Sequence, residues 1–472
     1  MRNLGGFISM SHTQAKENKM GTMPVPKLLV SMSLPMIISM LVQALYNIVD
    51  SIFVAQINEE ALTAVSLVFP VQNLMIAIAA GTGVGINALL SRNLGEKRSE
   101  EANLAARNGI FLGIMSCIVM ALIGLFGSHA FMASQTGNET IVNYGTQYMA
   151  IITVISVGIF MQVTLERLLQ ATGKTIYTMI TQGTGAIINI IMDPILIFGL
   201  FGFPRLEVAG AAIATVFGQI VAVILSLYFN ITKNKEINLN MKGFRPDKRV
   251  IGIIYQVGVP SIIMQSIGSV MVFGMNKILL LFSSTAAAVF GVYFKLQSFI
   301  FMPIFGLNNG LIPIVAYNYG AKNKHRILSS IKLSIGVAIS IMLLGLAIFQ
   351  ACPTQLLKLF GASEHMLEIG VPALRIISLS FVFAGYCIIL SSVFQALGNA
   401  VYSLIVSVAR QLFVILPVAY IFSRVFGLHM IWWAIPIAEI VSVLLSSLLF
   451  RRICRLKIYT LDSSNDTSVS IS

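Results

Sequence analysis

Apolar runs of about 20 residues recur from Val25 to Arg451, and no other feature of the chain restricts its fold as strongly. Each run is long enough to cross a ~30 Å hydrocarbon core as a helix. The alternating pattern of a membrane β-barrel is missing from the sequence. Only 10% of the 472 residues are charged, whereas a soluble domain carries about 25%. The sequence therefore predicts an all-α membrane protein.

We expect twelve transmembrane helices joined mostly by short connections. They are predicted at residues 27–55, 63–92, 104–129, 143–168, 180–203, 208–230, 252–281, 287–318, 328–350, 367–390, 403–426 and 430–450. The longest connection is the basic segment 231–250, at the middle of the chain.

The cations of the chain are divided unevenly between the two sides of the predicted membrane. With a cytoplasmic N-terminus, most of the 31 Lys and Arg residues fall in cytoplasmic segments, and the external loops hold only Arg205, Lys358 and Arg424. The positive-inside rule then places both termini in the cytoplasm. We expect a multi-pass protein of the cytoplasmic (inner) membrane, whose net charge of +13 requires no nucleic-acid partner.

A repeat at an offset of 225 residues relates the two halves of the chain. It pairs Pro35 with Pro260, Gln72 with Gln297, Gly81 with Gly306, Gly85 with Gly310, Gly95 with Gly320 and Lys97 with Lys322. Because the offset spans an even number of helices, both halves cross the membrane in the same sense. This predicts two six-helix lobes related by a pseudo-two-fold axis normal to the membrane. The expected boundaries are a tail 1–26, an N-lobe 27–230, a linker 231–250, a C-lobe 251–452 and a tail 453–472.

Two aspartates, Asp50 and Asp193, are the only ones inside predicted spans, and both belong to the N-lobe. An ionisable group at mid-membrane costs at least ~2.5–3.5 kcal/mol, so it is retained for a reason. Asn47 and Asn189 precede the two acids by three and four residues, which places each amide on the same helix face as its acid. We predict a functional cation site here; hydrogen bonding to neighbouring helices is the structural alternative.

Two prolines accompany the acids. Pro194 removes the hydrogen bond to the carbonyl of Ile190, and Pro35 does the same for Ser31. A carboxylate, an amide and a freed carbonyl on bendable helices can coordinate a proton or Na⁺. We therefore predict a site that holds one of these two cations, with Pro35 and Pro194 as points of bending.

Other polar and aromatic residues of the spans give weaker signals. Adjacent Glu166 and Arg167 predict a local pair near a helix end, or a part of the ion path. Glu439 is expected to be structural, and Lys295 to anchor its lobe through carbonyl groups. Further cations of the second half are Lys277, Arg375 and Arg410. A substrate cavity could be lined by Tyr46, Asn47, Phe160, Met161, Met264, Gln265 and Met271, although such stripes also face lipid or the core.

Motifs for bound cofactors and common enzymes are missing. The sequence has no usable P-loop, HExxH, CxxC or GxSxG element, which argues against an ATP-driven pump and a metalloprotease. The four cysteines show no metal or disulfide spacing. We expect no cofactor and no enzymatic activity.

Several segments resemble the MATE (multidrug and toxic compound extrusion) family, most closely its bacterial DinF/MepA-like branch. They read LYNIVDSIFVAQI at 45–57, GINALLSRNLGEKR at 85–98, LLQATGKT at 168–175, NIIMDPILIFG at 189–199 and VAYNYGAKNKHR at 315–326. The resemblance covers residues 27–450 and implies the MATE-type fold of two lobes with alternating access.

The resemblance also implies a function. It implies efflux of drug-like organic cations, including antibiotics, in antiport with H⁺ or Na⁺, by a protein that we expect to be monomeric. Asp50, Asn189 and Asp193 would form the cation site, with Thr215 as a further ligand and Pro35 as the bend. The NorM-type branch carries acids on its seventh and tenth helices, but the corresponding segments 259–273 and 375–389 contain none. Coupling is therefore expected in the N-lobe.

Two other functions are compatible with parts of the sequence. A lipid-linked oligosaccharide flippase of the same superfamily would use the cations of the second half. A membrane-embedded enzyme acting on lipid or prenyl substrates would need clustered acids, and the two aspartates lack the DDxxD arrangement.

Overall fold

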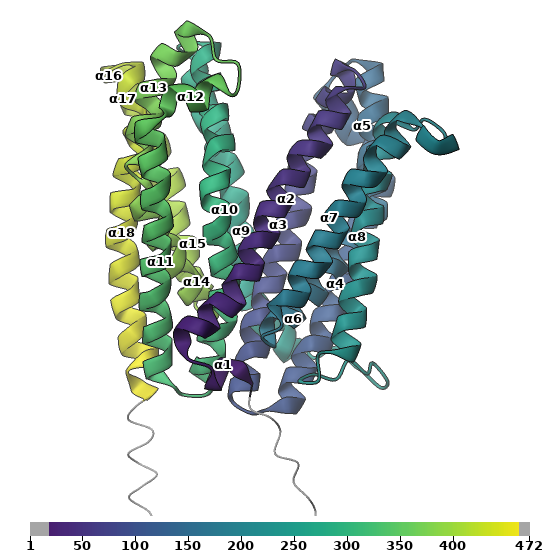
Figure 1. Cartoon of the computed structure of the whole chain (residues 1–472), viewed down its shortest axis with the longest axis vertical. Coiled ribbons are helices and arrows are strands. Elements are labelled where there is room, and N and C mark those ends of the chain that lie inside the picture. The colour runs from purple at the N-terminus through teal and green to yellow at the C-terminus, as the bar shows by residue number, and fades with distance from the viewer. Residues whose placement is uncertain (1–17, 462–472) are drawn as a thin grey trace, which may run out of the picture.

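The computed structural model describes residues 18–461, and every regular element in this part of the chain is helical. Figure 1 shows two groups of helices that converge at one end and splay apart at the other. We call these the α1 end, where α1 and the loop 233–247 lie, and the α17 end. Residues 1–17 and 462–472, parts of the predicted tails, lie outside the described residues.

The elements follow the order expected for two lobes. The N-lobe comprises α1 (Lys19–Thr22), α2 (Val25–Ala55), α3 (Glu59–Gly95), α4 (Ser99–Gln135), α5 (Glu139–Val154), α6 (Val157–Ala171), α7 (Thr175–Phe198), η1 (Leu200–Gly202) and α8 (Glu207–Thr232). The C-lobe comprises α9 (Lys248–Leu280), α10 (Ser284–Gly320), α11 (Lys324–Ala351), α12 (Pro353–Lys358), α13 (Glu364–Ser378), α14 (Phe381–Ala396), α15 (Ala400–Val408), η2 (Ala409–Ile415), α16 (Leu416–Val425), α17 (Leu428–Ile431), α18 (Ala434–Ile453) and η3 (Cys454–Ile458).

Twelve spans are present in the described residues, as predicted, but two of them are broken. Ten helical stretches are long and apolar enough to cross a membrane, and two bent helix pairs complete the twelve. The pair α5 and α6 bends by 41°, and the pair α13 and α14 by 48°. The predicted spans 143–168 and 367–390 are therefore present, and each contains a break that its sequence did not reveal.

Local hydrogen bonds account for the breaks. At the first break, the backbone N–H of Ser156 donates to the carbonyl of Thr153 (3.3 Å), three residues back instead of four. At the second, Ser380 donates in the same way to Ile377 (3.0 Å). Such tightened turns interrupt the α-helical ladder and change the direction of the chain. The two breaks lie at nearly equivalent positions of the repeat, so they belong to the shared scaffold.

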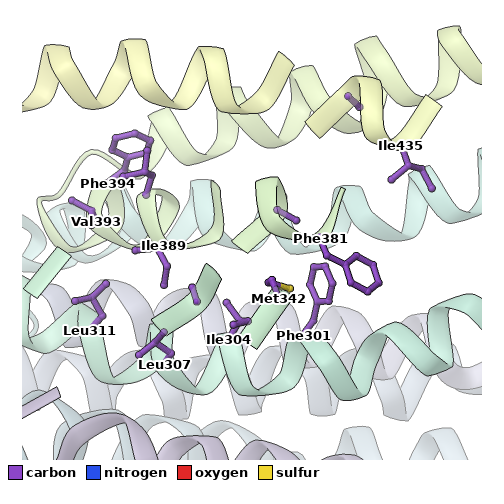
Figure 2. Close-up of a cluster of buried hydrophobic side chains, with 14 of the residues drawn as sticks. Phe301, Ile304, Leu307, Leu311, Met342, Phe381, Ile389, Val393, Phe394 and Ile435 are labelled. Atoms are coloured by element: carbon purple, nitrogen blue, oxygen red, sulfur yellow. The ribbon is translucent and has the colours of Figure 1, made fainter. Parts of the chain in front are cut away.

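Large apolar side chains form a continuous core in the C-lobe (Figure 2). The ring centroid of Phe381 lies 5.5 Å from that of Phe301 and 5.0 Å from that of Phe349. These rings join α10, α11 and α14, and Ile435 of α18 belongs to the same core. This core packs the helices of the C-lobe against one another.

Glycines allow the two lobes to touch near the α1 end. A Cβ atom on Gly95 of α3 would overlap the carbonyl oxygen of Tyr317 in α10. A Cβ atom on Gly320, the repeat partner of Gly95, would overlap the carbonyl oxygen of Arg92. Helix backbones can come this close only where small residues lie at the contact. The repeated glycines therefore form a symmetric contact between the lobes.

Candidate functional site

The packing of α2 against α7 brings the two membrane aspartates together. The carboxyl groups of Asp50 and Asp193 lie close enough to interact with each other. Asp193 is fully buried, and Asp50 is partly exposed. Two carboxylates this close repel each other unless a proton or another cation lies between them. The sequence placed both acids in one lobe, and the structure makes them a pair.

Oxygen atoms without partners surround this pair. Both carboxylate oxygens of Asp193, Oδ1 of Asp50 and Oδ1 of Asn189 are buried and accept no hydrogen bond in the structure. The side-chain amide of Asn189 donates to Oγ1 of Thr215 (3.2 Å), so its oxygen stays available. Buried polar atoms normally have partners, and a cation would supply one for these acceptors.

The donors at this site are all oxygen atoms. Carboxylate, amide and hydroxyl oxygens suit a proton or a hard cation such as Na⁺ better than a transition metal. Within residues 18–461, no group of three or more His, Cys, Asp or Glu side chains could hold a metal ion. The residues therefore fit the predicted H⁺ or Na⁺. The four predicted ligands, Asp50, Asn189, Asp193 and Thr215, lie on the packed helices α2, α7 and α8, and their binding of a cation stays a prediction.

Two tyrosines border the site. Tyr46 lies one helical turn before Asp50 and within electrostatic range of both acids. Tyr148 of α5 is 1% exposed, lies within range of Asp50, and its hydroxyl accepts a hydrogen bond from Gln72 (3.0 Å). Tyr148 could not be predicted from the sequence, because a neutral residue in a mixed span gives no signal. The only hint in the sequence was that Gln72, the hydrogen-bond partner of Tyr148, matches Gln297 in the internal repeat.

The two prolines lie inside continuous helices. α2 runs from Val25 to Ala55 through Pro35, about four turns from Asp50. α7 passes through Pro194 and ends at Gly199, whose φ of 75° is left-handed. Bending at either proline stays a prediction.

The predicted cavity residues are only partly suited to that role. Phe160 is 2% exposed and packs in the core with Met75, Ala79 and Met120, so assigning it to a cavity was wrong. Met264 accepts a weak hydrogen bond from the hydroxyl of Ser391 within the C-lobe (3.7 Å). Asn47 is exposed. The other predicted cavity residues are partly buried: Tyr46, Met161, Gln265 and Met271.

Glu166 and Arg167 do not form the predicted local pair. Glu166 is buried and accepts hydrogen bonds from three neutral side chains: Gln162 (3.0 Å), Thr181 (3.0 Å) and Gln182 (2.7 Å). Arg167 donates to Gln170 (2.8 Å) and to Asn309 of α10 (2.9 Å). Arg167 therefore links the N-lobe to the C-lobe, and Glu166 ties α6 to α7.

The C-lobe contains a buried ion pair of its own. Nη1 of Arg410 lies 2.8 Å from Oε1 of Glu439, which is 5% exposed. Arg410 belongs to η2, where the eleventh span is π-helical. Lys277, Lys295 and Arg375 are exposed. Nζ of Lys295 lies 6.0 Å from the centroid of the Phe360 ring, and its anchoring through carbonyl groups stays a prediction.

The profile of the MatE family matches residues 35–195 and 260–421, one match in each lobe. The chain belongs to the MATE family. The two matches begin 225 residues apart, which is the offset of the internal repeat. Relatives of this MATE protein are named as transporters and not as enzymes.

Two relatives and one solved structure define the similarity. The chain is 28% identical to the multidrug export protein MepA of Staphylococcus haemolyticus, over 89% of this chain and 92% of the relative. It is also 28% identical to an FAD transporter of Shewanella oneidensis, over 91% and 95%. A structure described as the outward-facing conformation of a multidrug resistance MATE family transporter of the MOP superfamily aligns with a TM-score of 0.87. That alignment has 26% identity and covers 95% of this chain and 99% of the other.

Proposed function

We propose that this protein exports several drug-like organic compounds, mostly cations, across the cytoplasmic membrane in exchange for H⁺ or Na⁺, as a monomer. The observation that carries the proposal is the facing pair of Asp50 and Asp193, with four buried oxygen atoms that lack partners. Family membership and the similarity to MepA support the multidrug substrate range.

The direction of transport follows from the orientation of the lobes. Most of the cations lie in the segments expected at the α1 end, which therefore faces the cytoplasm. The lobes touch at that end and separate toward the α17 end (Figure 1). Substrate leaves from this conformation to the outside, and a cation enters the site from the same side.

Helix α2 connects the cation site to the contact between the lobes. It packs against α7 on one side and against α10 of the C-lobe on another. Near the α1 end, the hydroxyl of Ser33 in α2 donates to the carbonyl of Leu307 (3.4 Å). A cation between Asp50 and Asp193 removes their repulsion and draws α2 toward α7. Bending at Pro35 carries this shift to the α10 contact, so that the lobes part at the α1 end and the cation is released to the cytoplasm.

The FAD transporter among the relatives supplies a second candidate substrate class. The exposed cations Lys277, Lys295 and Arg375 of the C-lobe would favour an anion such as FAD. The same cations would also suit a lipid-linked oligosaccharide, but the two relatives described above are named for the export of drugs and the transport of FAD, so the flippase alternative is not favoured.

A substitution at the interlobe contact tests alternating access. In Gly320→Ala, the added methyl group overlaps the Arg92 carbonyl, so closure at the α1 end becomes unfavourable. We expect export to fall to background, and a cysteine introduced at the α1 end of the contact to react faster with a water-soluble maleimide. Gly336→Ala in α11, which meets no atom within 4 Å, is the control. Unchanged export in Gly320→Ala would contradict this role.

A transport assay tests the proposed function itself. Purified protein in liposomes should move a fluorescent organic cation when either a pH gradient or a Na⁺ gradient is imposed, and FAD is the comparison substrate. Efflux driven by one gradient identifies the coupling ion. Movement that ignores both gradients would refute antiport.

A further inference from the structure

A pocket of about 280 Å³ lies at the α1 end, where the two lobes meet. Arg92, Glu96 and Arg98 line it from the α3 side, and Tyr319 and Lys322 line it from the end of α10 and the turn that follows. The aspartate site lies far along the helices toward the α17 end, so this pocket has no part in the cation site.

Positive charge exceeds negative charge in the pocket. Glu96 is the only acid that lines it, within the part of the chain that the structure describes. It pairs with Nε of Arg92 (2.8 Å) and with Nη1 of Arg98 (3.0 Å), so two guanidinium groups share one carboxylate. Lys322 is exposed and has no acidic partner among the described residues.

Arg92 and one further cation, Lys457, lie close to the ring of Tyr319, which lines the pocket. The guanidinium of Arg92 lies 5.3 Å and the ammonium of Lys457 lies 5.8 Å from the centroid of Tyr319. Like charges this close repel each other, and the single carboxylate of Glu96 is too little to balance them. A concave site with excess positive charge and both guanidinium and ammonium donors has the chemistry of a phosphate site.

We propose that this pocket binds a phosphate-bearing anion, either the headgroup of an anionic phospholipid or a soluble phosphate compound. Basic pockets between transmembrane helices at a membrane surface bind anionic headgroups. The pocket is larger than one phosphate group, so part of a headgroup also fits. Both lobes supply cations, and the contact of Gly320 with the Arg92 carbonyl lies beside them. A bound anion therefore stabilises the conformation in which the lobes touch at the α1 end.

The test compares the full-length protein in nanodiscs of phosphatidylcholine, with phosphatidylglycerol or inorganic phosphate added as the probe. The readouts are the thermal unfolding midpoint and, for the lipid, the number of molecules retained in native mass spectrometry. The pocket variants are Arg98→Gln, Lys322→Gln and the double variant. Lys242→Gln, in the loop between the lobes and outside the pocket, is the control for general surface charge.

We expect the probe to raise the midpoint of the wild-type protein and of Lys242→Gln. Each pocket variant should bind about fivefold more weakly, because each removes one cation from an anionic contact. All variants should have similar midpoints in phosphatidylcholine alone, which shows that they fold. An effect of phosphatidylglycerol alone identifies a headgroup site, and an effect of inorganic phosphate identifies a soluble ligand. No effect of either probe, or equal binding by the double variant, would overturn the proposal.

Discussion

Asp193→Asn is expected to abolish export of an organic cation while the protein still reaches the membrane in normal amount. The amide has the shape of the carboxyl group, so helix packing persists. It is always neutral, however, so it can neither take up and release a proton nor attract Na⁺ with a negative charge. The same result is expected for Asp50→Asn, because the proposed site holds one cation between the two interacting carboxyl groups. Efflux from cells loaded with a fluorescent cation, with membrane protein quantified in parallel, measures both effects.

Glu101→Gln is the matched control for these variants. Glu101 is an acid on α4 that pairs with Arg249 at the surface (2.9 Å) and lies outside the cation site. Surface pairs of this kind contribute little to stability. Export should persist in Glu101→Gln and vanish in the two aspartate variants. Wild-type export by either aspartate variant would remove the assigned site.

Arg410→Met is expected to destabilise the C-lobe by about 3–5 kcal/mol, because it leaves the buried carboxylate of Glu439 without its partner. The double variant Arg410→Met/Glu439→Leu should recover most of this loss, since apolar residues of similar volume often replace a buried pair without cost. Thermal unfolding of the purified protein in one detergent measures all variants.

The comparison also separates a structural ion pair from a functional one. Recovery of both stability and export in the double variant supports the structural role that the sequence predicted for Glu439. Recovered stability without export would assign the pair a part in transport. If the double variant is as unstable as Arg410→Met, the ion-pair explanation is contradicted. The double variant contains neither buried charge, so an unpaired charge could not explain its loss of stability.

Much of the fold could be predicted because lipid imposes strong rules on sequence. Uninterrupted apolar length reveals spans such as α2 and α4, and the glycines of the repeat reveal the two lobes. The breaks at Ser156 and Ser380 could not be predicted in this way. They depend on single backbone hydrogen bonds within stretches that stay apolar, so hydropathy does not change there.

The charged residues of the site could be predicted from the sequence. Asp50 and Asp193 are conspicuous because acids are costly in a membrane, but their contact depends on how α2 packs on α7. Glu166 accepts hydrogen bonds from three neutral side chains on two helices. Its position next to Arg167 in the sequence gave no indication of these partners. Phe160 shows the opposite error, because an aromatic residue on a helix face packs in a core as readily as it lines a cavity.

We propose that substrate and a cation exchange at the pair of Asp50 and Asp193. The most direct measurement is ion release from the purified protein when an organic cation is added, followed with a pH indicator or a Na⁺-sensitive dye in weakly buffered detergent solution. We expect release from the wild-type protein and none from Asp50→Asn or Asp193→Asn. Equal release from the variants, or substrate binding by the wild-type protein without any release, would contradict it.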